Sequence, residues 1–145
     1  MTLKTPTGTV LYTIEQAIKE YRRFSQTNIS KIHNGITVDQ TLTLILIDKN
    51  PDLNQKELAN LIFKDYASLT RIIELMVKKG FLDRKINKKD RRRFTLIITS
   101  KGRNTIKELT PAIEYNRRTA LQGLTVEQIL ELQNTLQIII NNCKK

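Results

Sequence analysis

The chain is predicted to be mainly α-helical (α+β), with several amphipathic helices and a single two-stranded β-hairpin. Three observations lead to this fold class. Apolar residues recur every three or four positions along most of the 145 residues. Pairs of polar residues with the spacing of a helix capping box occur at three places. Only between about residues 81 and 98 does the apolar period change to two, which is typical of strands.

Two helices are expected before residue 50. The first covers residues 8–33 and ends at Asn34-Gly35. Its apolar stripe, with steps of three and four, begins with Leu11, Ile14 and Ile18. Thr37 and Gln40 have the spacing of a capping box and begin a second helix, which runs to about residue 49. Asn50-Pro51 then ends that helix.

A short helix and an amphipathic helix follow. Asn54 and Glu57 form a second candidate capping box, which begins a helix over residues 55–62. Asp65 is placed to cap the next helix, over residues 66–79. Its apolar face consists of Leu69, Ile72, Ile73 and Met76. Its opposite face begins with the small or polar residues Tyr66, Ala67, Ser68, Thr70 and Arg71.

Gly80 ends this helix, and the β-hairpin comes next. One strand is expected over residues 81–86 and the other over residues 94–98, with a polar tip between them. Thr99 or Ser100 then caps a helix to about residue 122, which Pro111 kinks or breaks. Leu124, Thr125 and Gln128 begin the last helix. Its apolar seam has the spacing of a coiled coil and consists of Ile129, Leu132, Leu136, Ile139 and Cys143.

The positive charge of the chain is concentrated around the hairpin. The formal net charge is +11, from 25 Lys and Arg against 14 Asp and Glu. Residues 64–93 contribute eleven basic and four acidic residues, and residues 84–93 alone contain seven basic residues around Asp90. A bare run of this kind could be a solvated loop, but here the flanking strands place it on the arms and tip of a hairpin. Such a surplus predicts an anionic partner.

Several function classes are disfavoured by composition. One Cys and one His provide no metal-binding cluster and no convincing nucleophile pair, and the five glycines are all isolated, so we expect no metal, no cofactor and no enzyme activity. The longest apolar run, residues 44–47, is far shorter than a membrane span, and residues 1–10 lack the features of a secretory signal. We therefore expect a soluble, cytoplasmic protein with no membrane partner.

The order short helix, turn, amphipathic helix and basic hairpin predicts a winged helix-turn-helix. In this motif the second helix enters the major groove of duplex DNA, and the hairpin, or wing, reaches towards the adjacent minor groove. The residues expected at the DNA are Tyr66, Ala67, Ser68, Thr70 and Arg71 in the helix, and Arg84, Lys88, Lys89, Asp90, Arg91 and Arg92 in the wing. The alternative is a winged helix that contacts proteins or binds nucleic acid without sequence preference.

Three segments in this region resemble the MarR family of prokaryotic transcriptional regulators. Residues 65–71 resemble the start of that family's recognition helix, and residues 79–84 its transition from helix to wing. Asp90-Arg91-Arg92, followed by Ile98-Thr99 and Gly102, is similar to the family's wing signature. The spacing from residue 80 to residue 102 needs no gap.

The resemblance implies a homodimer that acts on a pseudo-palindromic operator, more often as a repressor. It implies a single MarR-like chain over residues 1–145, with a DNA-binding lobe over 36–100 and dimerisation helices over 8–33 and 101–143. The dimer contacts would be Leu11, Ile14 and Ile18 with Ile129, Leu132, Leu136 and Ile139. Arg92 would be the minor-groove arginine and Asp90 its partner, although an acid at a hairpin tip can also simply favour the turn.

The resemblance also suggests release of the DNA by a small aromatic or anionic effector. Arg22 and Arg23 are candidates to line an anion pocket below the DNA-binding lobe. The simpler interpretation of both arginines is a solvated helix face.

Overall fold

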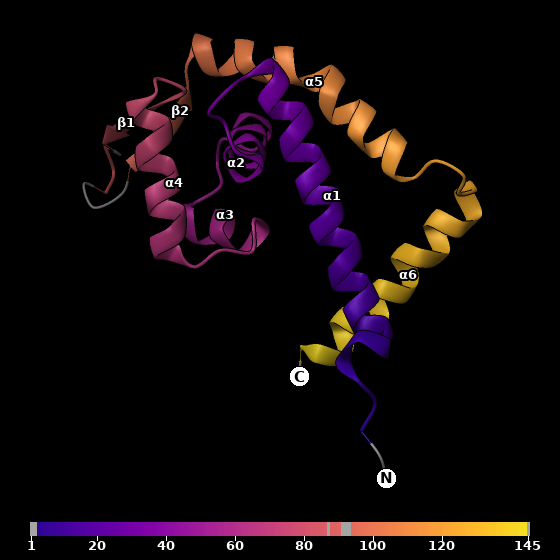
Figure 1. Cartoon of the computed structure of the whole chain (residues 1–145). Helices are drawn as coiled ribbons and strands as arrows, with labels where there is room; N and C mark the ends of the chain where they lie inside the picture. Colours follow the sequence, from indigo (N-terminus) through magenta and orange to yellow (C-terminus); the bar gives the residue numbers. More distant parts are fainter. Residues whose placement is uncertain (1–2, 87, 91–93, 145) are drawn as a thin grey trace.

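The computed structural model describes residues 3–86, 88–90 and 94–144. In this part of the chain a short 3-10 turn, six α-helices and one two-stranded sheet follow one another (Figure 1). The elements are η1 (Pro6–Gly8), α1 (Val10–Ile32), α2 (Val38–Lys49), α3 (Gln55–Leu61), α4 (Tyr66–Lys78), β1 (Leu82–Ile86), β2 (Phe94–Ile98), α5 (Ser100–Ala120) and α6 (Val126–Cys143). The predicted fold class is confirmed.

The capping residues expected from the sequence begin the helices. Complete capping boxes stand at Thr37 with Gln40, Asn54 with Glu57, and Thr125 with Gln128. The Asp65 carboxylate accepts the backbone N–H of Ser68 at 2.7 Å and caps α4. Each cap satisfies an N–H group that the first turn of a helix leaves unpaired, so these residues fix where the helices start.

Several predicted boundaries are corrected by one or two residues, and the helices expected to end at residues 33, 62 and 79 end at Ile32, Leu61 and Lys78. The first helix begins at Val10 and not at residue 8, because Pro6–Gly8 forms a 3-10 turn and the Thr9 side chain caps α1. α5 is capped by Thr99 and ends at Ala120, short of residue 122, where Leu121 closes the last turn. Pro111 does not break α5, since the helix is continuous through it from Ser100 to Ala120.

The first strand begins at Leu82, one residue later than predicted, because Phe81 belongs to the turn that ends α4. Gly80 has a φ of +84°, a left-handed conformation that favours glycine. The N–H of Phe81 donates to the carbonyl of Met76 at 2.9 Å, which closes the turn. Phe81 then enters the core and is 1% exposed. β1 and β2 pair antiparallel with Leu82 opposite Ile98 and Ile86 opposite Phe94.

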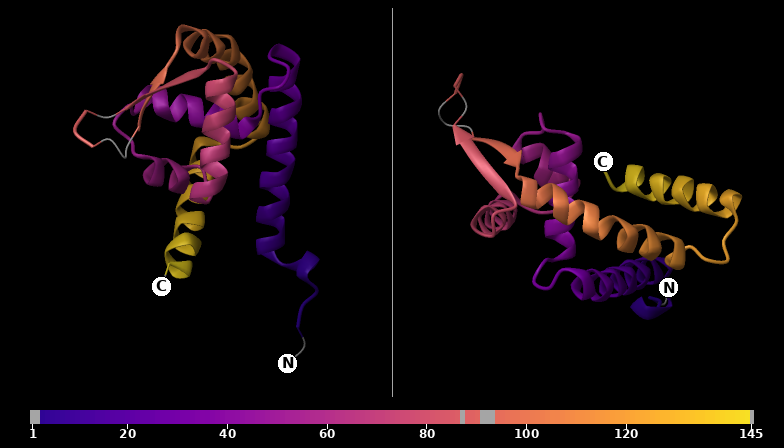
Figure 2. Two further views of the ribbon diagram at one scale, coloured as in Figure 1. Left: turned by 90° about the vertical axis from the view of Figure 1, so that its left-hand side faces the viewer. Right: turned by 90° about the horizontal axis from the view of Figure 1, so that it is seen from above.

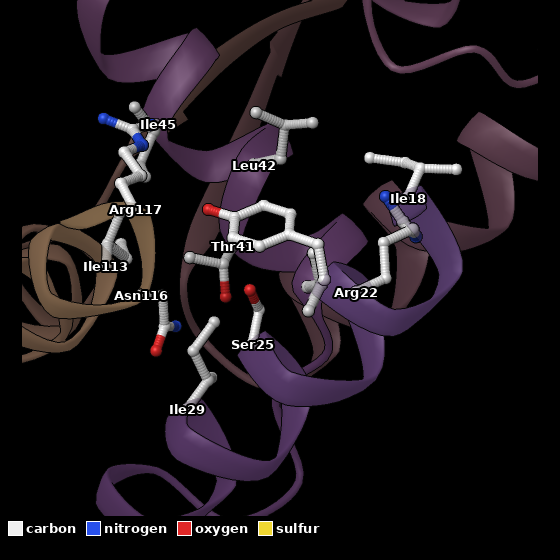
Figure 3. Close-up of a pocket in the computed structure, with 12 residues that line it drawn as sticks. Ile18, Arg22, Ser25, Ile29, Thr41, Leu42, Ile45, Ile113, Asn116 and Arg117 are labelled. Atoms are coloured by element: carbon white, nitrogen blue, oxygen red, sulfur yellow. The ribbon is translucent and has the colours of Figure 1, made fainter. Parts of the chain in front are cut away.

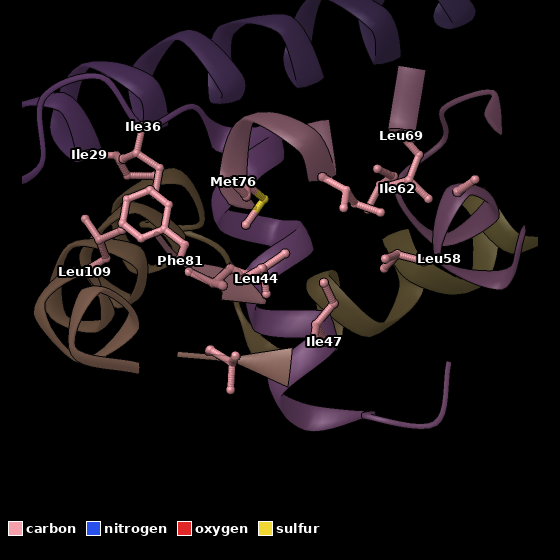
Figure 4. Packing of buried hydrophobic residues seen from close by; sticks show 14 residues of the cluster. Ile29, Ile36, Leu44, Ile47, Leu58, Ile62, Leu69, Met76, Phe81 and Leu109 are labelled. Atoms are coloured by element: carbon pink, nitrogen blue, oxygen red, sulfur yellow. The ribbon is translucent and has the colours of Figure 1, made fainter. Parts of the chain in front are cut away.

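The hydrophobic core lies where α2, α4 and the base of the hairpin meet the C-terminal end of α1 and the middle of α5 (Figure 4). The expected apolar face of α4 points into it, with Leu69, Ile73 and Met76 buried and Ile72 partly buried. α3 contributes Leu58 and Ala59. Because the apolar face of α4 is buried in the core, the opposite, polar face points towards solvent, as the 3.6-residue period predicts.

The long helices α1 and α5 pack against each other, whereas α6 stands apart. The Asn28 side-chain amide donates to Asn116 Oδ1 at 2.8 Å across the α1–α5 contact, where Asn116 is buried. Seen from above, α5 lies between α1 and α6 (Figure 2). No residue of α6 is buried in the described chain. None of the helices in the described ranges is both long and apolar enough to cross a membrane.

Candidate nucleic-acid interface

The N-terminal half of α4 presents the predicted recognition residues to solvent. Tyr66 is 58% exposed, Ala67 and Arg71 are exposed, and Ser68 and Thr70 are half-buried. The hydroxyl of Thr70 donates to the Tyr66 carbonyl at 2.9 Å, so its hydrogen is used within the helix. Arg71 Nη2 donates to Ser68 Oγ at 3.3 Å, which places these two side chains together on the exposed face. The five predicted residues of this helix thus lie together in the first half of α4, each of them exposed or half-buried.

The cap of α4 adds an exposed negative charge at the start of this surface. Hydrogen bonds from Ser68, first its backbone N–H, lower the pKa of Asp65 below its usual value. A carboxylate is favoured at the N-terminus of a helix, since the macrodipole is positive there. Asp65 therefore stays ionised at neutral pH and fixes the first turn of α4, from which the exposed side chains project.

The hairpin projects from the lobe beside α4 and carries the wing residues (Figures 1 and 2). Arg84 in β1 and the tip residues Lys88, Lys89 and Asp90 are exposed. Arg91 and Arg92, the remaining predicted wing residues, lie outside the described residues. The hairpin, with its exposed basic residues, thus lies beside α4, and both elements extend from one packed core.

The base of the hairpin is held by residues of the segment that resembles the MarR family. The Thr99 hydroxyl donates to the Gly80 carbonyl at 2.6 Å and accepts the N–H of Gly102 at 3.0 Å. The Thr99 N–H donates to the Phe81 carbonyl at 3.1 Å. These contacts join the end of α4, the end of β2 and the start of α5. Gly80, Thr99 and Gly102 therefore position the hairpin relative to α4.

A pocket of about 170 Å³ lies between α1, α2 and α5 (Figure 3). Apolar side chains form most of its wall. Its polar lining consists of Tyr21, Arg22, Ser25, Thr41, Asn116 and Arg117. The Ser25 Oγ is buried and has no hydrogen-bond partner among the described residues. A buried hydroxyl without a partner is costly, so this atom marks a place for a polar ligand atom or water.

The two arginines considered for an anion pocket differ. Arg22 lines the pocket and is paired with Asp39, and its side chain is still 44% exposed. Arg23 is exposed and pairs with Glu20 at 2.9 Å, as a solvated face predicts. The reason is the helical rotation: Arg22 shares a face with Ile18, Ser25 and Ile29, which also line the pocket.

Sequence reasoning missed Asp39 and Lys64. Asp39 contacts both Arg22 and, at 3.3 Å, Lys64 Nζ. Burial raises the pKa of the Asp39 carboxyl, but the hydrogen bonds and charges of Arg22 and Lys64 outweigh this effect and leave the pKa below its ordinary value. No local pattern signals this cluster, since its members lie on separate elements. Among the described residues no group of His, Cys, Asp or Glu is placed to hold a metal ion.

Comparisons with known proteins agree with the arrangement of α4 and the hairpin described above. Residues 36–94 match the model of the MarR family. The chain is 27% identical over 119 residues to the HTH-type transcriptional regulator BilQ of Clostridium symbiosum. The aligned region covers 82% of this chain and 81% of that protein.

Two solved structures show the same fold. A mutant of Escherichia coli MarR complexed with operator DNA superposes with a TM-score of 0.81 at 21% identity, covering 92% of this chain and 93% of that one. BpsR of Bordetella bronchiseptica, whose DNA binding is regulated by 6-hydroxynicotinic acid, gives a TM-score of 0.84 at 17% identity, covering 95% and 97%. The winged helix-turn-helix fold is therefore confirmed, and within it residues 36–94 match the MarR family.

Proposed function

We propose that the chain is a sequence-specific regulator of transcription that binds duplex DNA as a homodimer. The observation that carries the proposal is the exposed polar face of α4 next to the exposed basic hairpin. A helix of this kind fits the major groove, and a basic hairpin fits the neighbouring backbone and minor groove. Two solved structures with this fold, of Escherichia coli MarR and Staphylococcus aureus MepR, are complexes with DNA, which supports DNA as the partner.

Individual residues would have different roles at the DNA. Ser68 and Arg71, which contact each other, would face base edges from the first turns of α4. Tyr66, Ala67 and Thr70 would complete this surface. Lys88 and Lys89 at the tip, with Arg84, Arg91 and Arg92, would contact phosphates or enter the minor groove beside Asp90.

A second copy of this chain would cover α6 and the first half of α1. Along α6, Leu132 remains exposed and Ile129, Leu136 and Ile139 are only half-buried. Leu11 and Ile18 of α1 are also exposed, and Ile14 is half-buried. Apolar stripes of this length on two helices fit an interface between copies. In a dimer the two recognition helices would read half-sites about one helical turn apart.

The pocket supports regulation by a small ligand. Its wall is mainly apolar, and Arg22 and Arg117 offer two cationic groups for an acidic substituent. An aromatic or other organic anion fits this chemistry. Since such a regulator acts on DNA, we place it in the bacterial cytoplasm, as a repressor that the ligand releases. This function is binding, without catalysis.

Selection of bound duplexes from a random pool tests the DNA-binding proposal. We expect a pseudo-palindromic consensus, and an affinity that falls steeply with salt because several phosphates are neutralised. Sedimentation of the protein with and without the selected duplex should give two chains per duplex. Binding with equal affinity to every duplex would instead favour a non-specific binder, and a lack of binding would favour a winged helix that contacts proteins.

A further inference from the structure

We infer that Phe63 is a further specificity-determining residue, whose ring contacts the 5-methyl group of a thymine at the edge of the major groove. The inference rests on the proposed function and names one feature of the DNA that this chain reads. Phe63 lies in the turn between α3 and α4, three positions before Tyr66, the first residue of α4. Two observations on this residue carry the inference: its φ is +59°, and it is 91% exposed.

The backbone of this turn has the hydrogen bonds of a Schellman motif. The N–H of Lys64 donates to the Ala59 carbonyl at 3.0 Å, and the N–H of Phe63 donates to the Asn60 carbonyl at 3.3 Å. The left-handed position of this motif is usually glycine, because a Cβ atom is unfavourable there. In the described part of the chain, Phe63 is the one residue other than glycine with a positive φ. The turn therefore holds a bulky side chain at the position where it is least favourable.

Packing within the protein does not account for the aromatic ring of Phe63. The preceding residue, Ile62, is buried in the core, and the Nζ of the following residue, Lys64, lies 3.3 Å from Asp39. The ring of Phe63 remains in solvent. A single exposed apolar side chain is ordinary on a protein surface, but one on a strained backbone is not. Strain of this kind is typical of functional sites, so the ring has a role outside the fold.

The surroundings of Phe63 favour DNA as the partner of the ring. The turn leads directly into the exposed first half of α4, and Leu61 and Tyr66 on either side of it are 48% and 58% exposed. The chain that follows, residues 64–93, contains eleven basic and four acidic residues, so a polyanion fits this region better than the apolar surface of another protein. The apolar group that the major groove offers is the methyl group of thymine, which a phenylalanine can contact.

The test replaces each thymine of the selected operator in turn by deoxyuridine, which keeps the base pair and removes only the methyl group. At one thymine of each half-site, we expect the replacement to weaken binding of the wild type about fourfold, the effect of one buried methyl group. Phe63→Ala should weaken binding to the unmodified operator by about three- to tenfold. It should also abolish the effect of the replacement at that thymine, because both changes remove the same contact. Phe63→Leu should retain part of the effect.

Two further variants separate the contact from effects on folding. Phe63→Gly relieves the strain and should be more stable than the wild type, so its weaker binding cannot come from unfolding. Leu75→Ala is the matched control, since Leu75 is an exposed apolar residue near the other end of α4, and it should leave both the affinity and the effect of deoxyuridine unchanged.

Two results would overturn the inference. One is that Phe63→Ala binds the operator as tightly as the wild type, which would point to a protein partner at this turn. The other is that no thymine shows an effect of deoxyuridine that Phe63→Ala abolishes. A wild-type protein that selects no operator would instead refute the proposed function itself.

Discussion

The α-carbon of Gly102 lies directly against the carbonyl oxygen of Phe81. A Cβ atom at position 102 would be 2.4 Å from that oxygen and 2.8 Å from Ile98 Cγ1. This contact lets α5 start close to the end of α4, and it accounts physically for a glycine three residues after Thr99. The carbonyl cannot retreat easily, because it also accepts the N–H of Thr99.

We therefore expect Gly102→Ala to destabilise the protein. Alanine is the better helix former, so any loss must come from the clash with the backbone, and overpacking of this kind costs about 1–3 kcal/mol. Urea unfolding measures the change. Gly8→Ala is the control, since a Cβ there would meet nothing within 4 Å. Equal stability of the two variants would contradict the close approach.

A substitution at Phe63 should stabilise the protein, in contrast to Gly102→Ala. Phe63 adopts a φ of +59° and is 91% exposed, so no burial of the aromatic ring compensates for the backbone strain. A left-handed residue other than glycine costs about 1–2 kcal/mol, part of which the freedom of glycine in the unfolded chain offsets. Phe63→Gly should therefore raise the free energy of unfolding by about 0.5–1 kcal/mol.

Phe63→Ala separates strain from the loss of the aromatic ring. Alanine keeps a Cβ and therefore keeps the strain, so its stability should remain close to that of the wild type. Thermal and urea unfolding of the three proteins provide the comparison. If Phe63→Ala stabilises as much as Phe63→Gly, relief of the backbone is not the cause.

The lowered pKa of Asp39 predicts a dependence of stability on pH. A carboxyl whose pKa is lower in the folded state binds fewer protons there than in the unfolded chain, so it stabilises the fold above the unfolded value of about 3.9. This contribution is lost as the pH falls through the folded pKa. In Asp39→Asn the contribution is absent at every pH. The melting temperatures of wild type and variant should therefore converge below about pH 4. A constant difference from neutral to strongly acidic pH would show that Asp39 does not act through its charge.

Local chemistry made most of the fold predictable. Capping pairs such as Thr37 with Gln40, and the apolar period of α4, depend on residues within one or two turns, and both were confirmed. The sequence predicts Phe81 in the first strand because its apolar side chain continues the alternation of the strand residues. In the structure Phe81 instead closes the turn that ends α4. The pairing of Arg22, Asp39 and Lys64 was not predictable, since it depends on how three separate elements meet. The roles of the DNA-contacting and dimer residues stay predictions.

The last prediction concerns Arg71 and Arg92, which would read different grooves. Arg71 stands on the exposed face of α4 within reach of Ser68, so Arg71→Ala should change the base preference at one position of each half-site as well as the affinity.

Arg92, which lies outside the described residues, has the position of the wing arginine in the family resemblance. Arg92→Ala should weaken operator binding by at least about 1 kcal/mol and leave the selected major-groove bases unchanged. Repeating the duplex selection with each variant, together with gel shifts at matched salt, separates the two roles. An unchanged consensus for Arg71→Ala would contradict base reading by α4, whereas unchanged affinity for a folded Arg92→Ala would contradict the role of the wing.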